Sequence, residues 1–96
     1  MKTITLLLLT LTTLALNAQT TIKGTVADTK GEWLTGANVF LKGTYDGVAT
    51  NTAGRFELKT NLLGKQVLVV AFMGFTTVEQ EIALEGKALE LKIVMK

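Results

Sequence analysis

The sequence predicts an all-β fold, a sandwich of about seven short strands. Apolar and polar residues alternate with a period of two in most segments after residue 20, as they do in strands that bury one face. Nine glycines punctuate these segments, and proline, which would interrupt a strand ladder, is absent from all 96 residues. Together these patterns indicate antiparallel strands joined by short turns.

The stretch from Leu34 to Phe56 shows this pattern most clearly. Residues 37–42 alternate as a half-buried strand does. Asp46-Gly47 supplies the positive φ angles that a tight hairpin turn needs. Asn51 to Gly54 predicts a second turn, in which the Asn51 side chain accepts a backbone hydrogen bond and Gly54 takes the left-handed conformation.

The same reading gives the other elements in order. Residues 66–73 have no polar alternation, so this segment is predicted to be a central strand with both faces buried. A buried helix is the rival interpretation, but the β-branched residues, the short length and the flanking Gly64 and Gly74 favour a strand. In the loop 60–65, Leu62 and Leu63 are expected to cover an end of the core. The predicted strands are residues 21–27, 37–42, 48–51, 55–59, 66–73, 75–84 and 89–95.

Residues 1–18 are predicted to be a cleaved signal peptide. Lys2 precedes an apolar run, and a small residue, Ala18, ends the segment. The run from Ile4 to Leu16 is about 13 residues, well short of the roughly 20 that a spanning helix requires. We therefore expect cleavage before Gln19, one exported domain over residues 19–96, and no membrane insertion of the mature chain. Its destination is the periplasm, the outer membrane or the medium.

Composition excludes several classes of function. Loss of residues 1–18 removes only Lys2, so ten basic residues become nine against eight acidic ones, a net charge of +1. Such a chain has no electrostatic footprint for nucleic acid or an anionic membrane. The sequence contains no His and no Cys, so the commonest general base, the thiolate nucleophile and the usual zinc ligands are missing. We expect no enzyme activity, no cofactor and no metal.

The remaining carboxylates favour structural roles. Glu79 and Glu81 lie two apart and so share one strand face, which is more typical of a solvated surface than of an acid–base pair. Asp28, Asp46 and Asn51 offer oxygen ligands for a hard cation, but they lack the dense spacing of a calcium loop. Turn formation is the preferred interpretation for all three.

Turn and core motifs carry a family resemblance. They are Gly24-Thr25-Val26, Gly31, Gly36-Ala37-Asn38-Val39, Gly43-Thr44 and Thr50-Asn51-Thr52-Ala53-Gly54-Arg55-Phe56. Over residues 22–96 the chain resembles carboxypeptidase-like regulatory domains, which are transthyretin-like β-sandwiches. The resemblance implies a seven-stranded antiparallel Greek-key sandwich and a non-catalytic module outside the cytoplasm. Such modules follow some metallocarboxypeptidase domains or stand at the N-terminus of TonB-dependent outer-membrane receptors. Asn51 departs from the Asp usual there, yet it can form the same turn.

Two functional hypotheses follow. The first is an exported module for protein contacts or domain spacing, whose partner is a neighbouring domain or an outer-membrane receptor. The second is a carbohydrate-binding module, in which exposed Trp33 and Tyr45 stack on a sugar. Phe40 lies opposite the buried positions of its strand and is a further candidate for contact with a ligand or partner.

Overall fold

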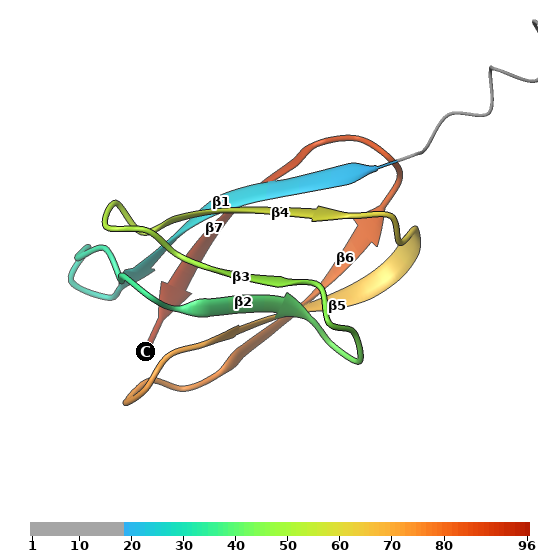
Figure 1. The fold of residues 1–96 in the computed structure, drawn as a ribbon. Coiled ribbons are helices and arrows are strands. Elements are labelled where there is room, and N and C mark those ends of the chain that lie inside the picture. Colours follow the sequence, from blue (N-terminus) through green and yellow to red (C-terminus); the bar gives the residue numbers. More distant parts are fainter. Residues whose placement is uncertain (1–18) are drawn as a thin grey trace, which may run out of the picture.

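A computed structural model describes residues 19–96, which form seven strands in two sheets packed face to face (Figure 1). The predicted signal peptide, residues 1–18, lies outside the described residues. Within the described range no helix is long and apolar enough to cross a bilayer. The strands are β1 (Thr20–Asp28), β2 (Asn38–Leu41), β3 (Gly47–Ala49), β4 (Arg55–Thr60), β5 (Gly64–Ala71), β6 (Val78–Leu84) and β7 (Leu89–Met95).

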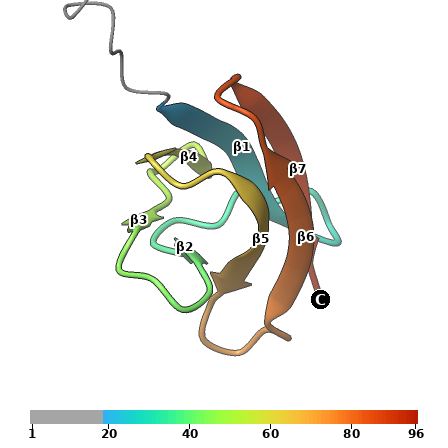
Figure 2. The same ribbon diagram turned by 90° about the vertical axis from the view of Figure 1, so that its right-hand side faces the viewer.

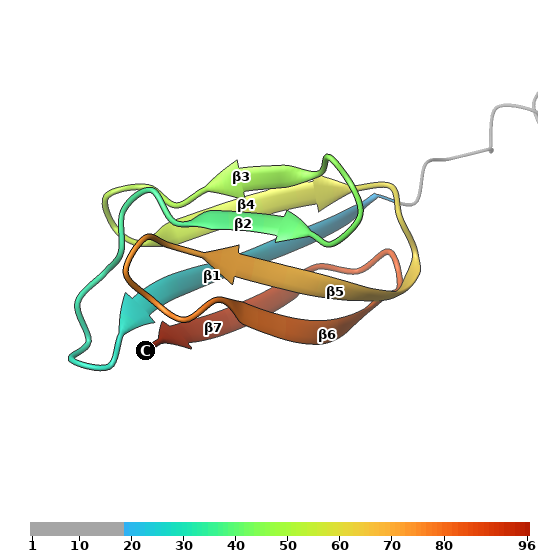
Figure 3. The ribbon, with the colours of Figure 1, turned by 90° about the horizontal axis from the view of Figure 1, so that it is seen from below.

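The strand order shows one departure from an all-antiparallel sandwich. One sheet has the order β4-β1-β7 and the other β3-β2-β5-β6. All pairs are antiparallel except β1 and β7, which run parallel from Ile22 beside Leu89 to Asp28 beside Met95. The expectation of antiparallel pairing throughout is wrong here because β7 follows β6 from the opposite sheet. It enters the first sheet beside β1 in the same direction, as seen from below (Figure 3).

The predicted strand segments are confirmed, with shifted ends. The sixth strand begins at Val78 and not at residue 75, because Phe72 to Phe75 form a turn closed by a hydrogen bond from Phe75 N–H to Phe72 O (3.1 Å). The rings of Phe72 and Phe75 lie 5.6 Å apart in this turn. These two apolar residues contact each other in a turn, so their apolar character does not mark them as strand residues, and a period-two pattern cannot distinguish the two cases.

The prediction of a central, two-sided strand at residues 66–73 is largely confirmed. β5 lies between β2 and β6. Leu68 and Val70 belong to the main core and are fully buried, whereas Val69 points to the outer face and is still only 5% exposed. Leu62 packs against the core as predicted, but Leu63 is exposed. The core residues are Ile22, Val26, Leu34, Ala37, Val39, Leu41, Phe56, Leu58, Leu68, Val70, Ile82, Leu84, Ile93 and Met95.

The hairpin between β2 and β3 differs from the prediction. No residue other than glycine has positive φ in residues 19–96, and the glycine with positive φ here is Gly43 (78°), not Gly47. Gly47 instead belongs to β3 and pairs with Phe40. Leu41 N–H donates to Asp46 O (3.0 Å), so the turn spans more residues than the two-residue loop expected at Asp46-Gly47. Asp46 serves through its side chain, which accepts a hydrogen bond from the Thr60 hydroxyl (2.7 Å).

A buried threonine, Thr50, fastens the β1–β2 connection to the end of β3. Its hydroxyl donates to Leu34 O (2.6 Å) and accepts from Ala37 N–H (2.9 Å), and its backbone N–H donates to Ala37 O (3.0 Å). The residue is only 4% exposed. Both hydrogen bonds of the buried Thr50 hydroxyl are made to backbone groups, and no buried side-chain polar atom among the described residues lacks a hydrogen-bond partner.

Thr50→Val is expected to lower the free energy of unfolding by about 2–4 kcal/mol, because it leaves two buried backbone groups without their partner. Thermal melts followed by circular dichroism measure the loss. Thr52→Val is the control, since Thr52 is exposed and the change should cost less than about 0.5 kcal/mol. Equal melting temperatures for the two variants would contradict the role assigned to Thr50.

Candidate contact surfaces

The turn from Asn51 to Gly54 has the predicted geometry. The Asn51 side-chain oxygen accepts hydrogen bonds from the backbone N–H groups of Ala53 and Arg55, both at 3.0 Å. Gly54 has a φ of 67°. Its carbonyl accepts from Val26 N–H (2.7 Å), which holds the turn against β1. The oxygen atoms of Asn51 are therefore used by the turn itself.

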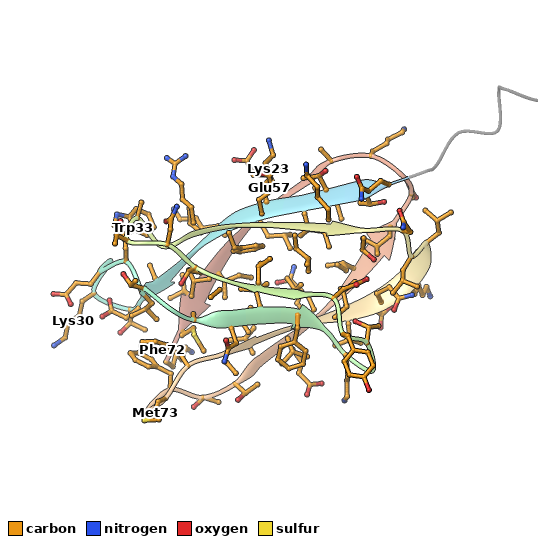
Figure 4. All side chains as sticks on the ribbon, viewed as in Figure 1. Lys23, Lys30, Trp33, Glu57, Phe72 and Met73 are labelled. Atoms are coloured by element: carbon orange, nitrogen blue, oxygen red, sulfur yellow. The ribbon has the colours of Figure 1, made fainter. Side chains whose placement is uncertain are left out.

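Trp33 lies over this turn at one end of the sandwich (Figure 4). Its backbone bridges Ala27 at the end of β1. A Cβ atom placed on Gly54 would lie 3.0 Å from the Trp33 Cβ and 3.2 Å from its ring, so the indole packs directly on the glycine. The side chain is nevertheless 52% exposed. Trp33 thus has both a structural contact and a solvent-facing ring.

Tyr45 is fully exposed, but it lies at the opposite end of the molecule, in the β2–β3 turn. Asp46 beside it bonds Thr60, which pairs with Thr20 at the start of β1, whereas Trp33 pairs with Ala27. Seven strand residues at about 3.3 Å each separate these positions, roughly 23 Å. The structure therefore places Trp33 and Tyr45 at opposite ends of the sandwich and does not bring them together in one sugar-stacking platform.

The outer face of the four-stranded sheet carries an apolar strip centred on Phe40. Phe40 is half-buried and pairs with Val69 on β5, which in turn pairs with Glu79 on β6. Phe40 and Glu79 therefore flank Val69 on this face. Beside them the Lys42 ammonium contacts the Glu79 carboxylate at 3.2 Å, an exposed ion pair. The strip is thus apolar at its centre with charges along one margin.

Met73, which the sequence did not indicate as a contact residue, extends this strip past the end of β5. Its side chain is 92% exposed in the turn after β5, next to half-buried Phe72. The sequence does contain a signal for an exposed apolar residue here: the apolar run of residues 67–73 continues past the strand up to Gly74, where a turn is expected. Figure 4 shows Phe72 and Met73 near the same end of the sheet. A shallow hollow there is lined by Gly36, Asn38, Ala71, Phe72, Met73 and Thr77. Phe72 also packs against the core, so we call Phe40, Val69, Ala71 and Met73 the apolar strip.

The outer face of the three-stranded sheet is charged instead. Lys23 on β1 stands between Glu57 on β4 and Glu90 on β7 in the strand register. The side view separates the two sheets that carry these contrasting faces (Figure 2). Charges of both signs alternate, which is typical of a solvated surface. The charged residues of this face are Lys23, Arg55, Glu57, Lys59, Glu90 and Lys92.

The candidate oxygen ligands do not converge. Asp28 accepts hydrogen bonds from Lys30 and Glu32 N–H in its own turn, both at 2.9 Å. Asp46 bonds Thr60 at the other end of the sheet. Residues 19–96 contain no group of three acidic side chains that could hold a metal ion. The Asp28 carboxylate shapes its own turn, as the sequence pattern favoured, whereas the Asp46 carboxylate joins the β2–β3 turn to the end of β4.

Comparison with known proteins places this geometry in a family. The family model described as CarboxypepD_reg-like domain matches residues 22–96. The TonB-dependent receptor SusC of Bacteroides thetaiotaomicron is 40% identical over 67 residues, 70% of this chain and 6% of the receptor. The TonB-dependent receptor P39 of Formosa agariphila is 37% identical over 72 residues, 75% of this chain and 7% of that receptor. The chain therefore spans less than a tenth of the length of these relatives.

Solved structures share the sandwich at low sequence identity. A chain of a type II cohesin–X-dockerin complex from Acetivibrio cellulolyticus matches with a TM-score of 0.67 and 22% identity, covering 79% of this chain and 56% of that one. A 3-chlorocatechol 1,2-dioxygenase from Rhodococcus opacus matches with a TM-score of 0.62 and 11% identity, covering 80% and 58%. These likenesses show a common fold and no more.

Proposed function

The chain belongs to the CarboxypepD_reg-like domain family, and from this we propose that it is a non-enzymatic module for protein contacts or domain spacing in the cell envelope. The observation that carries the proposal is the match to two TonB-dependent receptors, of which this domain makes up only 6% and 7%. A domain that small within a receptor is an accessory part. We propose the same role here, beside an outer-membrane receptor or as a piece of one.

Export belongs to the proposal as well. The apolar run after Lys2 has the length and ending of a signal peptide, and the matched receptors make an envelope location the consistent choice. The Greek-key, transthyretin-like topology is likewise proposed. It is supported by the chain path, since β4 crosses to pair with β1 and β5 crosses back to pair with β2.

The surface chemistry supports contact over catalysis. The sequence has no His or Cys, and two of the carboxylates already accept hydrogen bonds, that of Asp28 from its own turn and that of Asp46 from Thr60. The apolar strip, in contrast, presents Met73 to solvent at one end and half-buried Phe40 further along the same face. Exposed apolar patches with a polar margin mark sites of protein contact. We assign the contact with the envelope partner to this strip.

Photo-crosslinking in cells tests the assignment. With p-benzoylphenylalanine in place of Met73 or Phe40, ultraviolet light is expected to join the chain to one larger envelope protein, identified by mass spectrometry. The same probe in place of Lys59, on the outer face of the other sheet, is the control and should give no such adduct. Absence of any adduct at both strip positions, from a chain whose melt matches the unlabelled protein, would contradict the proposal.

A further inference from the structure

The strand β7 leaves one edge open. In the order β4-β1-β7 it pairs only with β1, so along residues 89–95 one row of backbone N–H and C=O groups has no strand partner within residues 19–96. Natural proteins protect such edges with proline, a very short strand, an inward-pointing charge or charged side chains, Lys above all. β7 has seven residues and no proline, and its inward positions are Leu89, Leu91, Ile93 and Met95. Of those protections β7 has only the outward-facing charges of Glu90 and Lys92.

The inward-pointing side chains of β7 are not all buried. Ile93 and Met95 are 3% and 0% exposed, whereas Leu89 and Leu91, which point inward on the same strand, are only partly buried. Figure 2 shows β7 beside β6 of the opposite sheet on this side of the molecule. An added strand along β7 would therefore cover apolar side chains as well as pair backbone groups.

We propose that the β7 edge binds the β7 edge of a second copy of this chain, joining the two three-stranded sheets into one continuous six-stranded sheet. The argument is charge complementarity. In an antiparallel pair centred on Leu91, Leu91 faces its own copy, and Glu90 faces Lys92 of the second copy. The two-fold symmetry repeats this pair, so both charges on each strand gain an opposite partner. On the inner face Leu89 then meets Ile93.

Neighbouring registers lack this match. Centring the pair on Glu90 places two carboxylates opposite each other, and centring it on Lys92 places two ammonium groups opposite each other, which is destabilising. A shift by one residue would turn inward side chains to the outer face. The charges of Glu90 and Lys92 thus favour the register centred on Leu91 over the two registers next to it.

The other edges are less suited to a second copy. β6 is also an edge with seven residues, but its only charges are Glu79 and Glu81, so self-pairing brings acid against acid or no charge pair at all. β3 has three residues. β4 lies next to β3 (Figure 1), and Thr60 at its end bonds Asp46 in the turn before β3. Charge and length therefore single out β7.

Charge reversal tests the pairing by sedimentation of the purified protein over a range of concentrations. The wild type is expected to show a monomer–dimer equilibrium. Glu90→Lys alone or Lys92→Glu alone should raise the dimer Kd by about tenfold to thirtyfold, because two attractive pairs become repulsive. The double variant Glu90→Lys/Lys92→Glu restores opposite charges across the pair and should return the Kd to within about threefold of wild type.

Controls separate this result from other causes. Lys59→Glu makes the same charge change on the opposite edge strand and should leave the Kd unchanged. Both Glu90 and Lys92 are exposed, so the melts of all variants should stay close to wild type. A protein that remains monomeric at millimolar concentration would overturn the proposal. So would a dimer whose Kd is unchanged in Glu90→Lys and in Lys92→Glu. An adduct to a larger protein at the apolar strip is a separate result and does not depend on β7.

Discussion

Leu68→Asp is expected to prevent the chain from folding. Leu68 lies in the middle of β5, is fully buried and belongs to the main core. A carboxylate there has no partner, and burying such a charge costs more than the roughly 5 kcal/mol that a small domain has available. The far-ultraviolet circular dichroism of this variant should lack the strand signal of the wild type at all temperatures.

The adjacent residue provides the matched control. Val69 is nearly as buried as Leu68, but it faces outward between Phe40 and Glu79. A carboxylate at this position can reach solvent, so Val69→Asp should still fold, with a loss of about 2–3 kcal/mol from the lost burial. Its melting temperature should fall by roughly 10–20 °C. If both variants fold, or neither does, the inward and outward assignment of β5 is wrong.

Gly54→Val is expected to give the second largest loss, above about 3 kcal/mol. Gly54 has a φ of 67°, which costs any residue with a side chain about 1–2 kcal/mol. A Cβ would also lie 2.7 Å from Val26 O and 3.0 Å from the Trp33 Cβ, too close for either contact. The turn would have to leave β1, and the hydrogen bond from Val26 N–H would be lost with it.

Two further variants separate crowding from backbone strain. Gly31 has a φ of 84°, but a Cβ there would have no heavy atom within 4 Å. Gly31→Ala should therefore cost only the backbone strain, about 1–2 kcal/mol, and Gly54→Ala should cost more. Asn51→Ala should lose about 1 kcal/mol through its side-chain hydrogen bonds. Urea unfolding measures all three, and equal losses for the two glycine variants would remove crowding from the explanation.

Much of the fold could be predicted because its information is local. The alternation of apolar and polar residues along β2, β4 and β7 shows directly which face of each strand is buried. The turn from Asn51 to Gly54 contains the side chain that stabilises it, because the Asn51 amide oxygen accepts the turn's hydrogen bonds. The β2–β3 hairpin was misassigned because Gly43 and Gly47 flank it four residues apart. Either glycine could supply the positive φ, and only the observed pairing of Gly47 with Phe40 decides between them.

The surface could be predicted less well because it depends on contacts between distant segments. Nothing near Thr50 in the sequence indicates that its hydroxyl reaches Leu34. Trp33 and Tyr45 are only twelve positions apart in the chain, yet the strand β2 between them carries them to opposite ends. The parallel pairing of β1 with β7 joins the first strand to the last, and no short-range pattern records it.

That parallel pairing has a mechanical consequence. β1 starts at one end of the sandwich and β7 finishes at the other, so the first and last strands end at opposite ends of the domain (Figure 3). Tension applied through the two ends would pull β1 and β7 past each other along their length. The backbone hydrogen bonds between them would share this load together and would not open one at a time. A domain that spaces or tethers its neighbours would in this way resist stretching until the whole ladder slips.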